Sequence, residues 1–248
     1  IKDGAKMSKS KGNVVDPDQL IREYGADTTR LFSLFAAPPE KDLEWNAQGV
    51  EGAHRFLNRL YRFINTLEPL QPGADTPPSG SGADQALTQK LHQTIKKVSY
   101  DIENDFHFNT AIAAIMELFN TVTSVSDPEK PDRAHPETIR EVLQTMLKLL
   151  FPMVPHFASE MYQQLQCGDA VDDGGWPRYD EQLAQEAMVT IVVQVNGKVR
   201  SRLELPADID DDSLQQLALG DENVRRFIAD QPVKKVIVIK KKLVNIVV

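Results

Sequence analysis

The chain has 248 residues, of which 41% are hydrophobic and 26% are charged, enough for one large domain or two modest ones. Its net charge of −8 argues against RNA binding driven by bulk charge but allows local basic patches. The single cysteine, Cys167, excludes an intrachain disulfide and a multi-thiolate metal site, so we predict no metal site and a cytoplasmic location. No apolar run is long enough to cross a membrane, and no membrane partner is expected.

Residues 1–13 form a lysine-rich segment. The string Lys-Met-Ser-Lys-Ser at 6–10 lies between Gly4 and Gly12, and residues 3–12 contain no aromatic or β-branched side chain. This composition excludes a buried strand or an amphipathic helix and predicts a mobile loop. Lysine ammonium groups on such a loop could hold a polyphosphate, and a solvated basic loop is the alternative. Because the chain begins inside this loop, we expect a piece of a longer protein.

Two short helices are predicted after the loop. Asp16 as N-cap and Pro17 in the first turn mark the start of a helix that ends at Gly25. Asp27 is expected to cap a second helix over residues 28–36. These helices would anchor the base of the loop.

A longer helix is predicted from Asn46 to about Leu67, because apolar residues recur there at steps of three and four. Arg55, Arg59 and Arg62 follow the same rhythm on a separate face. Three arginines in line could contact an RNA backbone, since phosphate contacts dominate RNA affinity. A solvated helix face is the alternative, and the pattern alone favours it slightly.

Further helices are predicted beyond a loop at residues 68–85 that is rich in proline and glycine. His107, which lies between two phenylalanines, is expected to be packed or bridging rather than catalytic. His156 and Glu160 are four residues apart and could form a hydrogen bond on one helix face. The helical stripes cover residues 87–102, 108–122, 139–151 and 156–166.

Apolar residues alternate from Met188 onward, which predicts a second, smaller domain. Asn196-Gly197 is a strong signal for a hairpin turn between two strands. The hairpin is followed by predicted helices over 211–219 and 221–229 and by strands over 235–239 and 243–248.

Basic residues gather in this second domain. Lys198, Arg200 and Arg202 alternate along one strand and are predicted to share a face of the hairpin. Lys240 and Lys242 add positive charge beside the last strands. Lysine commonly protects exposed strand edges, so edge protection and phosphate recognition both stay open.

Several strings resemble a known family. Lys-Met-Ser-Lys-Ser followed by Lys-Gly-Asn is similar to the second signature of class I aminoacyl-tRNA synthetases. The stretches that resemble bacterial-type leucyl-tRNA synthetases in particular are Ala26–Phe32, Ala37–Glu40, Leu43–Trp45, Gly49–Ala53, Arg55–Leu57, Val193–Lys198 and Leu243–Val248.

This resemblance implies an ATP-binding loop. The second lysine of the signature, Lys9, would stabilise charge developing on the departing pyrophosphate, with Lys6 as a supporting cation. The residues implied to bind ATP, with its Mg²⁺, are Lys6, Met7, Ser8, Lys9 and Ser10. The implied reaction joins leucine to ATP and then esterifies the 3′ end of tRNA-Leu.

The resemblance also implies a mainly α fold: a helical bundle of the class I anticodon-binding type, followed by a small α+β domain. The implied parts are the end of a catalytic domain (1–45), the bundle (46–168), a linker (169–187) and a tRNA-binding C-terminal domain (188–248). The implied tRNA-binding residues are Arg55, Arg59, Arg62, Lys198, Arg200, Arg202, Lys240 and Lys242. A monomer is expected.

One family signature is missing from the chain. The His-x-Gly-His nucleotide-binding element has no counterpart in the sequence. We therefore expect this chain alone neither to form the adenylate nor to charge tRNA. Two alternatives stay open: the equivalent part of a valine or isoleucine ligase, and a non-catalytic helical RNA-binding module.

Overall fold

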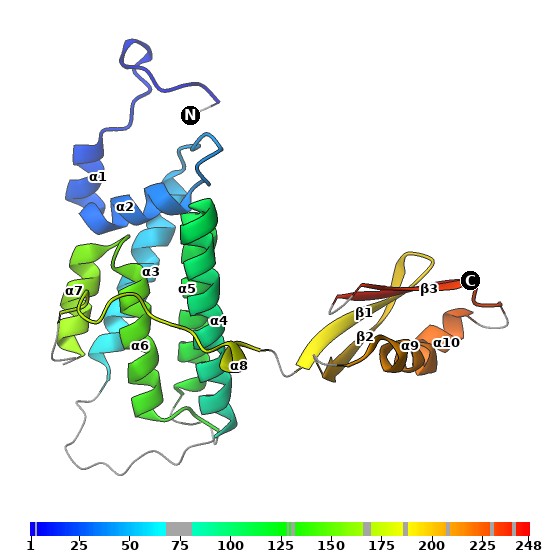
Figure 1. Cartoon of the computed structure of the whole chain (residues 1–248). Helices are drawn as coiled ribbons and strands as arrows, with labels where there is room; N and C mark the ends of the chain where they lie inside the picture. Colours follow the sequence, from blue (N-terminus) through cyan, green and yellow to red (C-terminus); the bar gives the residue numbers. More distant parts are fainter. Residues whose placement is uncertain are drawn as a thin grey trace. The chain divides into compact units, whose positions relative to one another are not determined.

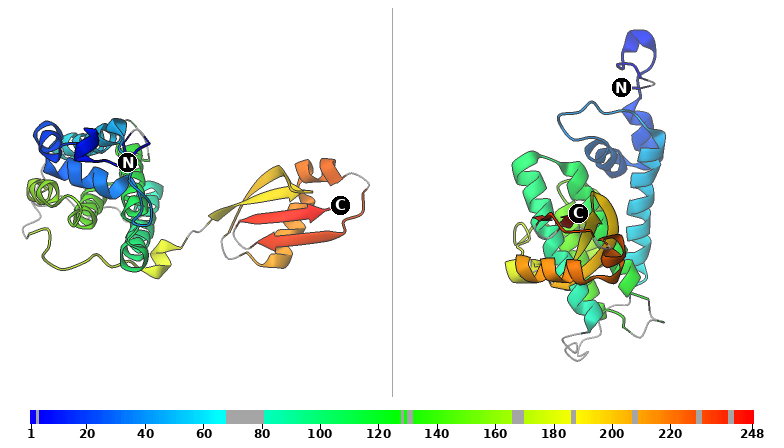
Figure 2. Two further views of the ribbon diagram at one scale, coloured as in Figure 1. Left: turned by 90° about the horizontal axis from the view of Figure 1, so that it is seen from above. Right: turned by 90° about the vertical axis from the view of Figure 1, so that its right-hand side faces the viewer.

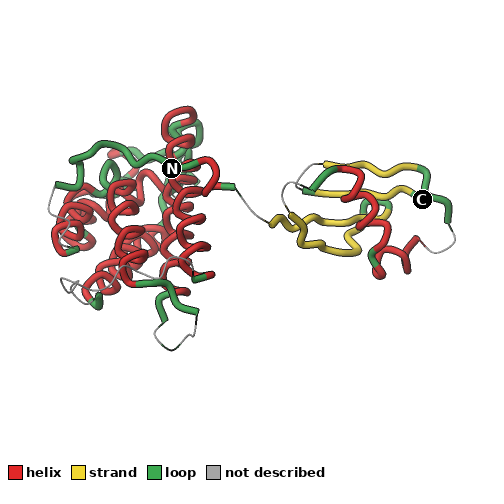
Figure 3. Tube along the Cα trace, turned by 60° about the horizontal axis from the view of Figure 1, so that its bottom comes forward, coloured by secondary structure: helices red, strands yellow, loops and turns green. Residues whose placement is uncertain are grey.

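The computed structural model describes residues 1–2, 4–67, 81–127, 129, 132–165, 170–185, 188–206, 209–228, 231–239 and 242–248. The chain divides into two compact units, residues 1–184 and 185–248 (Figure 1). The described part of the first unit is helical, and every described strand of the sheet lies in the second (Figure 3). The predicted fold class, a helical bundle followed by a small α+β unit, is confirmed. No helix in the described residues is long and apolar enough to cross a membrane.

Two short helices follow the N-terminal loop, as the sequence predicts. Helix α1 spans Pro17–Tyr24, and its N-cap Asp16 accepts a hydrogen bond from the backbone amide of Asp18 at 3.0 Å. Helix α2 spans Ala26–Phe35 and lies across one end of the bundle (Figure 1). The apolar side of α2 is buried against the helix that follows it, so α2 shares the core of the bundle.

The bundle consists of helices whose apolar stripes converge on one core. The apolar stripes predicted from the sequence are buried or half-buried there, around fully buried residues such as Phe119, Leu60 and Leu147. These helices are α3 (Ala47–Asn65), α4 (Gly82–Asp105), α5 (Phe108–Val125), α6 (Pro136–Leu150) and α7 (Pro155–Gln164).

Asp27 does not have the role predicted for it. Helix α2 begins one residue before Asp27, so its predicted N-cap role is wrong. The Asp27 carboxylate instead accepts a hydrogen bond from the backbone amide of Phe157 at 2.6 Å and lies 3.0 Å from His156 Nδ1. It thereby satisfies an amide in the first turn of α7 that has no partner within that helix. His156 is thus bonded to Asp27 rather than to Glu160, which accepts from Gln164.

Most of the predicted linker packs on the bundle. The indole nitrogen of Trp176 donates to Ser99 Oγ at 2.7 Å, and the backbone amide of Asp180 donates to His92 Nδ1 at 3.0 Å. The short helix α8 (Glu181–Ala184) adds an ion pair of 2.7 Å to Lys96 of α4. The described residues 170–184 therefore belong to the first unit, because polar contacts and packing hold them against α4 and α6.

The second unit is a sheet with helices on one face (Figure 2). Its strand order is β2-β1-β4-β3, with β1 and β4 parallel and the other pairs antiparallel. Asn196 and Gly197 both have positive φ, at 48° and 77°, as a tight hairpin between right-twisted strands requires. The elements are β1 (Met188–Val195), β2 (Lys198–Pro206), α9 (Asp211–Gly220), α10 (Glu222–Ile228), β3 (Lys235–Ile239) and β4 (Leu243–Val247).

Candidate functional site

The lysine loop has a defined backbone shape. Lys9–Lys11 form one 3₁₀ turn, which ends where the Gly12 amide donates to the carbonyl of Lys9 at 3.2 Å. Gly12 has φ of +66° and Gly4 has φ of +71°, a region that other residues rarely adopt. The glycines predicted to bracket the loop therefore reverse the chain on both sides of the two candidate lysines.

Asn13 holds this loop from the inside. Its Oδ1 accepts a hydrogen bond from the backbone amide of Ser8 at 2.9 Å, and its Nδ2 donates to the carbonyl of Lys6 at 3.3 Å. The hydroxyl groups of Ser8 and Ser10 lie 2.6 Å apart. Sequence reasoning assigned no role to Asn13. The available signal was an asparagine next to a turn glycine, because asparagine side chains often hydrogen-bond to nearby backbone groups.

Lys6 and Lys9 are exposed on this braced loop, and the described part of the chain offers neither of them an ion pair. Two ammonium groups without a carboxylate partner can stabilise an anion electrostatically. Met7 is half-buried, and the hydroxyl of Ser10 is exposed beside the lysines. The described residues contain no cluster of His, Cys, Asp or Glu that could hold a metal ion.

The base of the loop is tied to the bundle through the segment before α3. The carbonyl of Ile1 accepts from the amide of Trp45 at 2.7 Å, and the amino group of Ile1 donates to the carbonyl of Leu43. Glu40 in the same segment lies 2.7 Å from His107 Nε2, at the corner between α4 and α5. This hydrogen bond raises the pKa of His107 and lowers the pKa of Glu40. His107 is thus a bridging residue, one of the two roles predicted for it.

The three arginines of α3 differ in their contacts. All three are exposed, but the Arg59 guanidinium lies 5.4 Å from the centroid of the Phe119 ring. Arg59 also donates to Asn120 Oδ1 of α5 at 3.2 Å. The structure thus leaves Arg55 and Arg62 extended toward solvent and uses Arg59 in packing between α3 and α5.

The predicted common face of Lys198, Arg200 and Arg202 is wrong. A β-bulge opposite Val193 and Gln194 interrupts the alternation of β2. Arg200 therefore turns toward the helices, where its guanidinium stacks 3.6 Å from the Phe227 ring centroid of α10.

The other basic residues predicted to bind tRNA in this unit differ in position from Arg200. Arg202 pairs with Val192, whose neighbours in β1 face the helices, so Arg202 lies on the helix-free face of the sheet. Lys198 is exposed at the hairpin turn, and Lys242 is exposed just before β4. Lys240 lies outside the described residues.

Both the lysine loop and the helical bundle match known protein families. A family model for tRNA synthetases class I (I, L, M and V) matches residues 1–46, which contain the lysine loop. A second model, the anticodon-binding domain of tRNA ligase, matches residues 84–215. The leucine–tRNA ligase of Desulfotalea psychrophila is 55% identical over the whole chain, and that of Geobacter sp. strain M21 is 48% identical.

The chain belongs to the tRNA ligase family that carries this anticodon-binding domain. It spans about 30% of the length of these curated leucine–tRNA ligases. It also resembles the Agrobacterium radiobacter K84 agnB2 LeuRS, solved as a ternary complex with tRNA and LeuAMS. That likeness has a TM-score of 0.79 at 30% identity, and it covers all of this chain and 32% of that one. The family recognised from the sequence is therefore confirmed.

Proposed function

We propose that this chain is the C-terminal part of an enzyme that attaches leucine to tRNA-Leu through leucyl-adenylate. The observation that carries the proposal is the match to named leucine–tRNA ligases along the entire chain, lysine loop included. Relatives of this identity favour the leucine enzyme over the valine and isoleucine enzymes and over a non-catalytic module.

In this proposal residues 1–45 complete the ATP site. Lys9 stabilises the negative charge that develops on pyrophosphate as leucine attacks the α-phosphate, and Lys6 supports it. Met7, Ser8 and Ser10 complete the loop, and the hydroxyls of the two serines add donors. ATP brings its own Mg²⁺. The exposure of both lysines and the brace by Asn13 support this assignment.

The rest of the chain holds tRNA-Leu in this proposal. The bundle (46–168) contributes Arg55 and Arg62, with Arg59 placed by its contact with Phe119. The second unit (188–248) contributes the basic residues Lys198, Arg200, Arg202, Lys240 and Lys242. Of the proposed linker (169–187), residues 170–184 belong to the first unit and contact α4 and α6. A monomer in the cytoplasm fits a tRNA substrate and a chain with one cysteine.

The proposal predicts that this chain alone does not activate leucine. Purified chain should give no leucine-dependent ATP–pyrophosphate exchange, because its sequence has no His-x-Gly-His element to hold the nucleotide opposite the loop. The matched control is the longer ligase carrying the same sequence, which should exchange robustly under the same conditions. Leucine-dependent exchange by the chain alone would show that the nucleotide site is complete within these residues.

A further inference from the structure

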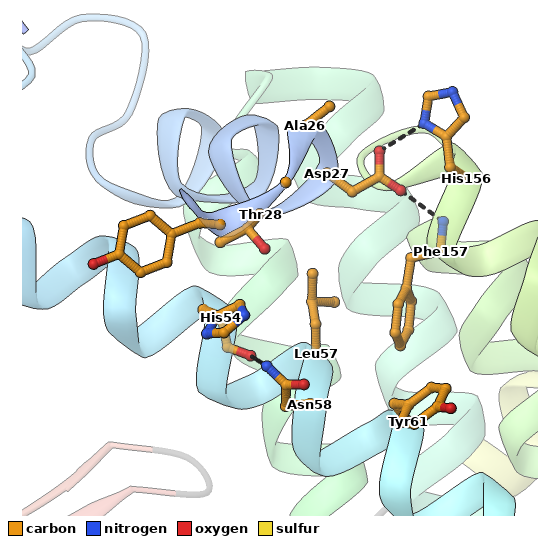
Figure 4. Close-up of a pocket in the computed structure, with 11 residues that line it drawn as sticks. Ala26, Asp27, Thr28, His54, Leu57, Asn58, Tyr61, His156 and Phe157 are labelled. Carbon is orange, nitrogen blue, oxygen red and sulfur yellow. Dashed lines mark hydrogen bonds and ion pairs between the residues drawn. The ribbon is translucent and has the colours of Figure 1, made fainter. Parts of the chain in front are cut away.

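A cavity of about 590 Å³ opens in the first unit, away from the lysine loop. It lies between the start of α2, the middle of α3 and the start of α7 (Figure 4). Neither the adenylation chemistry nor the basic residues proposed above use it. The residues that line it are Tyr24, Gly25, Ala26, Asp27, Thr28, His54, Leu57, Asn58, Tyr61, His156 and Phe157.

Aromatic side chains dominate the walls of this cavity. His54 lies on one side and Phe157 and Tyr61 lie on the other, with Leu57 between them (Figure 4). Tyr24 packs edge-on against His54, with ring centroids 5.5 Å apart. Tyr61 is 45% exposed although it is large and aromatic. Walls of this kind suit a flat, unsaturated ligand that can be covered on its faces.

Polar groups at the cavity are held in fixed orientations. Asn58 Nδ2 donates to the carbonyl of His54 at 2.9 Å, so Asn58 Oδ1 keeps a defined direction beside the cavity. The Asp27 carboxylate binds His156 Nδ1 and the amide of Phe157, which orients the exposed imidazole at the rim. Asn58 Oδ1 is thus placed to hydrogen-bond with the edge of a ligand, whereas the exposed His156 ring lies at the rim and points away from the cavity (Figure 4).

Charged side chains of both signs flank the cavity. Arg55 and Arg62 lie three residues before and four residues after Asn58, so they flank it on the surface of α3. Both arginines are exposed. Negative charge also lies near this cavity: Glu51 is one helical turn before Arg55, and Glu23 hydrogen-bonds with Tyr24 and, with Glu51, raises the pKa of Tyr24. The two arginines are therefore the groups that would meet the phosphates of a polyanion whose uncharged part enters the cavity.

Aromatic walls, oriented polar groups and flanking arginines are what proteins present to a base of single-stranded RNA. We propose that this cavity receives one unpaired nucleobase of the bound tRNA, with the adjoining phosphates against Arg55 and Arg62. This inference rests on the proposed tRNA-binding function and extends it to base insertion at a specific site.

The test is tRNA-Leu binding by the whole chain and by Tyr61→Ala and His54→Ala over a salt series. Each substitution should weaken binding about fivefold to a hundredfold, because each removes part of a base-stacking surface. The salt slope should not change, because no phosphate contact is lost. Arg62→Ala should instead lower the slope by about one. Tyr100→Ala is the matched control, since Tyr100 is 59% exposed on α4 outside the cavity.

Chemical probing of the tRNA at single-nucleotide resolution identifies the base. One unpaired base should be protected by the parent chain and by Tyr100→Ala, and it should react again with Tyr61→Ala. Parent-like affinity for both cavity variants, with no such base, would overturn the inference and leave the proposed function standing. Failure of the unmodified chain to bind tRNA-Leu would overturn both. Thermal unfolding of each variant checks that the bundle is intact.

Discussion

Replacing Lys9 with alanine in the longer ligase is expected to slow leucine-dependent ATP–pyrophosphate exchange by about 10²- to 10³-fold. The expected effect is large because the Lys9 ammonium is exposed and has no ion pair within the described residues that would occupy it. Its charge is therefore available for the phosphate groups. The KM for leucine should change little, because the loss falls on the transition state rather than on amino-acid binding.

Lys11→Ala is the matched control for this experiment. Lys11 lies in the same 3₁₀ turn as Lys9 and is equally exposed, so the substitution removes one positive charge from the same loop. If both variants lose activity equally, the loop acts through its total charge. If neither loses activity, Lys9 has no role in adenylate formation and the assignment is wrong.

Replacing Asn13 with alanine should slow the same exchange about fivefold to a hundredfold. The substitution removes the hydrogen bonds to the Ser8 amide and the Lys6 carbonyl, each worth about 0.5–1.5 kcal/mol. Asn13 is a positioning residue: it touches no substrate, and it acts by holding the loop that carries the lysines. Loss of this brace lets the loop sample other shapes, so the lysines are in place less often.

A double-mutant cycle separates positioning from general stability. If Asn13 acts through Lys9, adding Asn13→Ala to Lys9→Ala should cost much less than it costs in the parent ligase. Fully additive losses would show that Asn13 acts independently of Lys9. Asn13→Asp keeps the acceptor for the Ser8 amide and removes the donor to the Lys6 carbonyl, so it should retain part of the function.

The sequence predicted the features that depend on local pattern. The apolar stripe of α3, the N-cap at Asp16 and the Asn196-Gly197 turn all appear in the structure as expected. The predicted strands β3 and β4 differ from the structure by at most one residue at their ends. These features are set by neighbours along the chain, which a single sequence displays directly.

The predictions from sequence were wrong where a side chain contacts a residue far away in the chain. Aspartate is a residue type common at helix N-caps, but the Asp27 carboxylate accepts a hydrogen bond from the backbone amide of Phe157, 130 residues away. The alternation of Lys198, Arg200 and Arg202 predicts one common face of the strand, but a β-bulge turns the Arg200 side chain toward Phe227. Trp176 looks like part of a linker, but it bonds to Ser99 of α4. These contacts depend on tertiary packing between segments far apart in the sequence, which local propensities do not predict.

The binding equilibrium of this chain with tRNA is the most direct test of its assignment to the tRNA-holding part of a leucine–tRNA ligase. Affinities for tRNA-Leu and for tRNAs of other amino acids should be measured over the same salt series. We predict tighter binding of tRNA-Leu at every salt concentration. High salt weakens the phosphate contacts that all tRNAs share, but it weakens the contacts specific to tRNA-Leu much less. Equal affinity for all tRNAs with a steep common salt slope would contradict the assignment and describe a generic RNA binder.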